Sequence, residues 1–82
     1  MSEYANTIGL RGIAANIGSC YEKSFLAFQK GNTELAIEWD ILGSDMTFIG
    51  RQKARGGNQD ERLDAEYVAL IARWDRLNGL QN

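Results

Sequence analysis

The residues best suited to bind a phosphate lie between 50 and 62, in the stretch GRQKARGGNQDER. Three cations spaced two residues apart precede a pair of glycines. The amide groups at the N-terminus of a helix beginning after those glycines would attract an anion. The candidate site for a nucleotide or nucleic acid therefore combines the cations with the loop backbone: Arg51, Lys53, Arg55, Gly57 and Asn58.

The same stretch also reads as an ordinary connection between two helices. Basic side chains stabilise the C-terminal end of a helix, where the backbone carries partial negative charge. Gly56 suits the residue after a helix end, and the nearby Asp60, Glu61 and Asp64 would repel an anion. The loop itself has no aromatic residue on which a base could stack. A solvated loop is the favoured interpretation.

Three carboxylates, Glu34, Glu38 and Asp45, fall on one line if residues 33–54 form a helix. A metal site or an acid–base pair would need matching ligands from a second helix, and the sequence offers none. Residues 31–50 contain four acids and no bases, which favours a solvated acidic ridge or a surface that docks on a basic partner. We expect neither a metal nor a cofactor.

Catalytic groups are scarce. The chain has no histidine, the commonest general base, and its one cysteine, Cys20, falls on the apolar side of the first predicted helix. Reactive cysteines need exposure and positive neighbours, so a buried structural thiol is expected. No nucleotide-binding, nucleophile-elbow or zinc-protease motif is present. The sequence therefore predicts a protein that is not an enzyme.

The totals describe one small domain, residues 1–82, with 44% hydrophobic residues and a net charge of −2. That charge argues against general nucleic-acid binding, which usually requires a basic domain. No apolar run reaches the ~18 residues of a membrane span, and the N-terminus does not resemble a secretory signal. A lone thiol fits a reducing compartment. We expect a cytoplasmic protein, and a domain this small often relies on self-association for stability.

The chain must position these groups with an all-α fold of three helices, near 4–29, 33–54 and 58–78. In the third, large apolar residues recur every three or four positions, and Asn58 with Glu61 forms a capping box. That stripe is Leu63, Tyr67, Leu70, Trp74 and Leu77. In the first, the predicted stripe is Leu10, Ala14, Ile17, Tyr21, Ser24 and Phe28, flanked by Ile13, Cys20 and Phe25.

The glycines of the first helix require a reason, because each costs about 1 kcal/mol relative to alanine. Small residues fall on one line that would let another helix approach closely: Ala5, Gly9, Gly12, Asn16 and Ser19. The alternative is that the helix begins late, near Gly12, and that its first turns fray.

The middle segment permits two folds. As a helix it presents a stripe of Leu35, Trp39, Leu42, Met46 and Ile49. As a β-hairpin, its first strand would have Ile37, Trp39 and Ile41 alternating with Glu38 and Asp40, and residues 43–45 would form the turn. We favour the helix because its stripe is longer. Residues 27–40, AFQKGNTELAIEWD, also resemble the turn between the two helices of a tetratricopeptide repeat, with a small turn at 30–32 and the pair Ala36-Ile37. The resemblance implies a helical hairpin and says nothing about partners.

A helix in this segment would be apolar on two sides, since Ile37, Ile41 and Phe48 point nearly opposite to its main stripe. Either the helix lies between the other two with both sides in the core, or one side is an exposed interface. The second alternative predicts a homodimer or higher oligomer and a protein-binding module, an adaptor or inhibitor. The expected binding residues are Ile37, Ile41 and Phe48, with Glu34, Glu38 and Asp45 as a charged rim. A small acidic chain of this kind would suit a regulator or a phage-encoded antagonist of a bacterial system.

Overall fold

The computed structural model describes residues 2–57 and 60–80 and is helical almost throughout. Its elements are α1 (Ser2–Gln29), α2 (Thr33–Gln52), the short π-helix η1 (Lys53–Gly57) and α3 (Glu61–Leu80). Within the described residues there is no strand, so the predicted all-α domain of three helices is confirmed. The alternative of a β-hairpin in the middle segment is wrong, because that segment is the uninterrupted helix α2.

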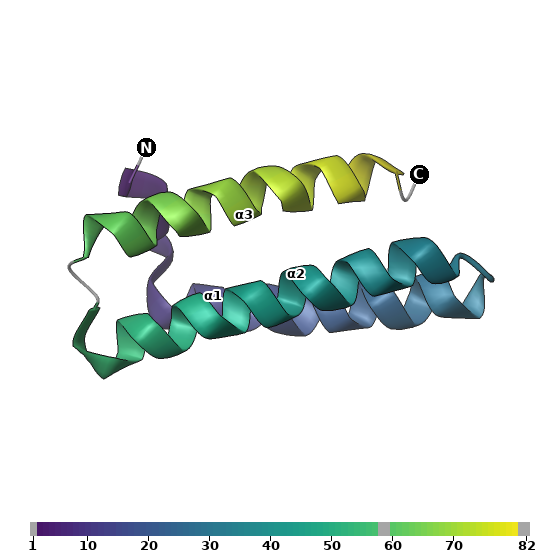
Figure 1. Ribbon diagram of the computed structural model, residues 1–82, viewed down its shortest axis with the longest axis horizontal. Coiled ribbons are helices and arrows are strands. Elements are labelled where there is room, and N and C mark those ends of the chain that lie inside the picture. The colour runs from purple at the N-terminus through teal and green to yellow at the C-terminus, as the bar shows by residue number, and fades with distance from the viewer. Residues whose placement is uncertain (1, 58–59, 81–82) are drawn as a thin grey trace.

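The helices form an elongated bundle measuring 40 × 21 × 16 Å. Helices α1 and α2 run antiparallel and pack against each other along their length, and α3 runs alongside both on one side of this pair (Figure 1). We call α1 and α2 together the hairpin. Its other side, away from α3, is covered by no element within the described residues.

The turn of the hairpin shows why the chain reverses at residues 30–32. Gly31 adopts a φ of 83°, in the left-handed region that favours glycine, and so ends α1. The Asn32 side chain then accepts a hydrogen bond from the Leu35 N–H at 3.2 Å, which caps the start of α2. The helical hairpin implied by the resemblance at residues 27–40 is therefore present.

The core is formed mainly by the predicted stripes of α2 and α3. Trp39, Leu42 and Met46 of α2 are completely buried, and Tyr67 of α3 is equally inaccessible. The Trp39 and Trp74 rings meet edge to face with centroids 5.3 Å apart, and the Lys23 ammonium lies 5.6 Å from each ring centroid. This edge-to-face pair with its cation–π contacts joins all three helices, because Lys23 belongs to α1, Trp39 to α2 and Trp74 to α3.

Helix α1 buries only part of the predicted stripe, Ile17 and Ser24, together with residues predicted to lie beside it. Its core line is Ile13, Ile17, Cys20, Ser24 and Ala27, while Leu10, Tyr21, Phe25 and Phe28 are exposed. Small residues decide this register, because they let α1 and α2 approach closely. The Ser24 hydroxyl donates to the Ala36 carbonyl at 2.8 Å, and a Cβ added at Gly43 would lie 3.0 Å from the Tyr21 ring.

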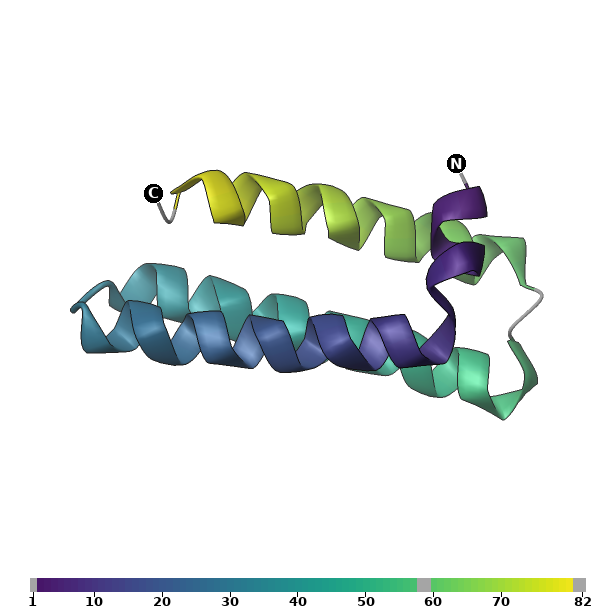
Figure 2. The same ribbon diagram turned by 180° about the vertical axis from the view of Figure 1, so that it is seen from behind.

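The first helix is interrupted at Gly9, whose φ of 64° and ψ of −175° are not helical. The backbone before Gly9 turns away from the rest of α1 toward the start of α3 (Figure 2). The predicted line of small residues from Ala5 to Ser19 is therefore broken at Gly9 and forms no continuous stripe. Gly9 is present because an ordinary residue disfavours this left-handed φ.

Candidate protein-binding face

Helix α2 is buried along one face only. Opposite the buried Trp39, Leu42 and Met46, the side chains of Ile37, Ile41 and Phe48 are 52%, 44% and 59% exposed. The alternative in which both sides of α2 lie in the core is wrong, because α1 and α3 both contact its main stripe and leave this second side open.

Helix α1 adds three aromatic residues that the sequence prediction had placed in or beside the core. Tyr21, Phe25 and Phe28 are 43%, 60% and 63% exposed. Together with Ile37 and Asp40 of α2 they line one shallow hollow on the hairpin. We call the six exposed apolar residues the apolar face: Tyr21, Phe25, Phe28, Ile37, Ile41 and Phe48.

A sequence signal for the α1 aromatics does exist. Two apolar lines run along α1, one of large residues and one of mostly small residues. The small line, with Cys20, Ser24 and Ala27, faces small residues of α2 such as Ala36 and Gly43. Matching small residues on both helices would have identified the contact and left the aromatic line outside.

The predicted acidic rim is divided between two environments. Glu34 and Glu38 are exposed and line a hollow with Ile37, Leu77 and Leu80. Asp45 instead accepts a hydrogen bond from Arg73 Nη1 at 2.8 Å and so connects α2 to α3. Two of the three predicted rim carboxylates therefore lie open beside the apolar face, and the third is engaged within the bundle.

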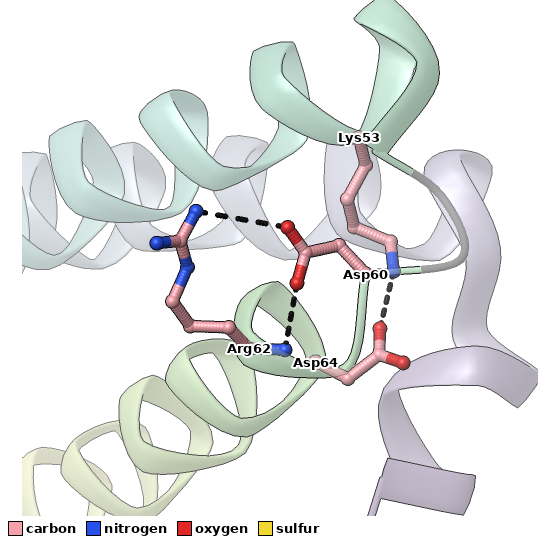
Figure 3. Close-up of polar contacts among 4 residues, drawn as sticks. All are labelled: Lys53, Asp60, Arg62 and Asp64. Carbon is pink, nitrogen blue, oxygen red and sulfur yellow. Dashed lines mark hydrogen bonds and ion pairs between the residues drawn. The ribbon is translucent and has the colours of Figure 1, made fainter.

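The basic stretch is also divided. Lys53 is buried, and its ammonium donates to the Asp64 carboxylate, which is buried as well (Figure 3). Arg51 and Arg55 remain exposed. Of the proposed backbone contributors, Gly57 ends η1, and Asn58 lies outside the described residues. The structure thus directs one of the three candidate cations inward and leaves two at the surface.

The start of α3 is capped by a carboxylate of its own chain. The helix begins at Glu61, and Asp60 occupies the capping position that the sequence assigned to Asn58. Asp60 accepts a hydrogen bond from the Arg62 N–H at 2.9 Å and lies 3.7 Å from the Arg62 guanidinium (Figure 3). An incoming anion would have to compete with this side chain for the amides.

Cys20 has the buried position predicted for it. Its Sγ lies 3.8 Å from Met46 Sδ, and burial raises the pKa of the thiol from 9.0 to about 11, against a smaller lowering by the charges of Lys23 and Arg73. A buried protonated thiol is a poor nucleophile. No cluster of three or more acidic or cysteine side chains suited to a metal ion occurs among residues 2–57 and 60–80.

None of the described helices is both long enough and apolar enough to cross a membrane. The chain matches no protein-family model, and no curated protein and no solved structure is significantly similar to it.

Proposed function

We propose that this chain is a non-enzymatic protein-binding module, an adaptor or inhibitor in the cytoplasm, that acts through the apolar face of its hairpin. The observation that carries the proposal is the exposure of six large apolar side chains on the hairpin, four of which line one hollow: Tyr21, Phe25, Phe28 and Ile37. In a chain of 82 residues these side chains are costly to expose, and larger exposed apolar patches usually mark interaction sites.

The size of the apolar face supports the same conclusion. An aromatic side chain can bury about 150–250 Å², so the observed exposed fractions correspond to about 100 Å² for each residue. The six residues together then expose roughly 600 Å², of which roughly 400 Å² belongs to the four residues around one hollow, within the range that monomers usually show in one patch. A standard interface buries about 800 Å² on each partner, of which somewhat over half is apolar. The apolar face is large enough to form the centre of such an interface.

The charges beside the apolar face favour a partner with basic residues. Glu34 and Glu38 are exposed next to Ile37, and Asp40 lines the hollow formed with the α1 aromatics. Such a rim contributes mainly to association rate and to rejection of acidic partners. A regulator or a phage-encoded antagonist that binds a basic patch on its target would use this combination.

The alternative of an anion-binding site receives less support. Lys53 is held by Asp64, and the Asp60 carboxylate occupies the start of α3. An enzymatic role is equally poorly supported, because the chain has no histidine and its thiol is buried.

The proposal is tested by capturing proteins from a lysate of the source cells with immobilised wild-type protein and with Ile37→Asp. A matched control is Ala72→Asp, which places the same charge at an exposed position of α3. We expect a protein that is retained by the wild type and by Ala72→Asp but is lost with Ile37→Asp, while circular dichroism shows all three chains folded. Equal retention by all three chains, or by none, would contradict the proposal.

A further inference from the structure

Basic and acidic side chains occupy different ends of the hairpin on both of its helices. On α1, Arg11 precedes Glu22 by eleven residues, and on α2, Asp40 precedes Arg51 by the same interval. Eleven residues are about three turns, or ~16 Å, so the two members of each pair lie on nearly the same side of their helix. All four side chains are exposed, and the structure gives none of them an ion pair within the described chain.

Because the helices are antiparallel, like charges meet at the same level. Ile13 of α1 lies beside Gly50 of α2, and Tyr21 lies beside Gly43. Arg11 is therefore level with Arg51 at the open end of the hairpin, and Glu22 is level with Asp40 nearer the turn. The open end is basic and the turn end is mainly acidic, with two exceptions: Lys30 in the turn and Lys23, whose ammonium lies over the Trp39 and Trp74 rings.

Gly18 lies between the two charged levels, and no packing contact within the monomer explains it. Gly18 is in the middle of α1, where glycine weakens a helix, yet a Cβ at this position would meet nothing within 4 Å. It lies one turn before Tyr21 and Glu22 and two turns before Phe25, and so on the same exposed side of α1. No neighbour within the described residues therefore requires residue 18 to be a glycine. Close approach by another molecule would require it.

We propose that a second copy of this chain covers the hairpin, with the two copies antiparallel about a two-fold axis that lies in the interface and runs perpendicular to the helices. Each α2 then packs against α2 of the second copy, and each α1 against α1. Arg11 and Arg51 of one copy face Glu22 and Asp40 of the other, and the helices cross closely near Gly18. The opposite orientation would place like charges together. This inference rests on the proposed function, since it names the first occupant of the same apolar face.

The proposed dimer satisfies the requirements of a stable two-fold interface. Such an interface is self-complementary, so every attractive contact occurs twice. In this register the exposed apolar residues nearest the axis are Tyr21 of α1 and Ile41 and Phe48 of α2, and they form the centre of an interface whose standard size is about 800 Å² per partner. Charge complementarity sets the orientation, and the apolar residues supply the affinity.

The decisive experiment is sedimentation velocity on the full chain over a range of protein concentrations, with Asp40→Arg, Arg51→Asp and the double variant that exchanges both charges. We expect a wild-type dimer. Each single variant replaces two attractions by two repulsions and should weaken the dimer roughly tenfold. The double variant should return to within about threefold of wild type, because the exchanged charges face each other again.

A further variant, Gly18→Leu, separates association from folding. The open space around Gly18 means that the monomer should keep or gain thermal stability, whereas the second copy should be excluded. A dimer unaffected by Gly18→Leu, or a double charge variant that fails to recover, would overturn the inference. Strengthening of the dimer by Asp40→Arg would also overturn it, because that result requires like charges to face each other.

The outcomes also distinguish this inference from the proposed function. A monomeric wild-type chain that captures another protein, and loses it on Ile37→Asp, overturns the dimer and leaves the protein-binding function intact. A monomeric chain that captures nothing removes both. A dimer with the predicted charge dependence supports the inference whether or not another protein is captured.

Discussion

The buried ion pair between Lys53 and Asp64 allows the strongest prediction about stability. Both residues are 1% exposed, and they join the end of α2 to the first turns of α3. The change Lys53→Met keeps most of the apolar stem and removes the ammonium, which leaves the Asp64 carboxylate facing an apolar side chain. Removing one member of a buried pair typically costs about 3–5 kcal/mol.

That cost is large for this domain. A chain of 82 residues is expected to have about 4–12 kcal/mol of total stability, so the variant should lose a quarter or more of it. Since 1 kcal/mol shifts the midpoint of a domain this size by about 4–8 °C, the melting temperature should fall by at least ~12 °C. The double change Lys53→Met with Asp64→Leu should recover most of the loss, because an apolar pair of similar volume removes both charges.

The assay is urea unfolding followed by tryptophan fluorescence, since Trp39 and Trp74 lie in contact at the centre of the bundle. Arg62→Gln is the matched control: its pair with Asp60 spans 3.7 Å and is exposed, so it should cost no more than about 0.5 kcal/mol. If Lys53→Met costs as little as Arg62→Gln, the reasoning about burial is refuted.

Two further predictions concern the contact between α1 and α2. Gly43→Leu should destabilise the bundle by about 2 kcal/mol or more in urea unfolding, because even a Cβ there would lie 3.0 Å from the Tyr21 ring and 3.3 Å from Cys20; an unchanged midpoint would show that the helices can separate at no cost. Cys20 should resist thiol reagents at pH 8 in the folded state. Because burial raises its pKa from 9.0 to about 11, its stabilising contribution is complete below pH 9 and is lost as the pH rises toward 11. Cys20→Ala should remove that loss, and an identical alkaline decline in both chains would contradict it.

The parts of the fold that could be predicted from sequence are those where one apolar line dominates a helix. In α2 and α3 the large residues follow a single stripe, and Trp39, Met46 and Tyr67 are buried as that spacing requires. In α1 two lines compete, and hydrophobicity alone selected the one that contains Phe28. Helix packing favoured the smaller line because Cys20 and Ala27 permit closer contact with α2, and of the predicted stripe it kept Ser24.

The candidate sites differ in predictability for a similar reason. The second apolar side of α2 followed from its own periodicity, because Ile37, Ile41 and Phe48 lie opposite its main stripe, but the sequence left open whether that side is exposed. The burial of Lys53 depends on Asp64, eleven residues farther on and across a helix connection, and no local pattern specifies that pairing. A basic residue at a helix end is usually solvated, so nothing in the pattern around Lys53 indicates that it is buried.

If the same apolar face binds both a second copy and another protein, the two associations compete. The affinity for the other protein is then reduced by the fraction of chains that are monomeric. The charge variants that weaken the dimer would accordingly strengthen capture of a partner that does not contact Asp40 or Arg51. The gain in apparent affinity for the other protein should equal the increase in the fraction of monomeric chains.

The measurement that tests the central claim most directly is the dependence of the melting temperature on protein concentration, for the wild type and for Phe25→Asp with Ile37→Asp. Both residues are more than half exposed, so the variant should fold as a monomer with a melting temperature independent of concentration. The wild-type melting temperature should rise with concentration, because association stabilises the folded state. A wild-type melting temperature that is independent of concentration, together with a variant that fails to fold, would show that the apolar face serves folding and not binding.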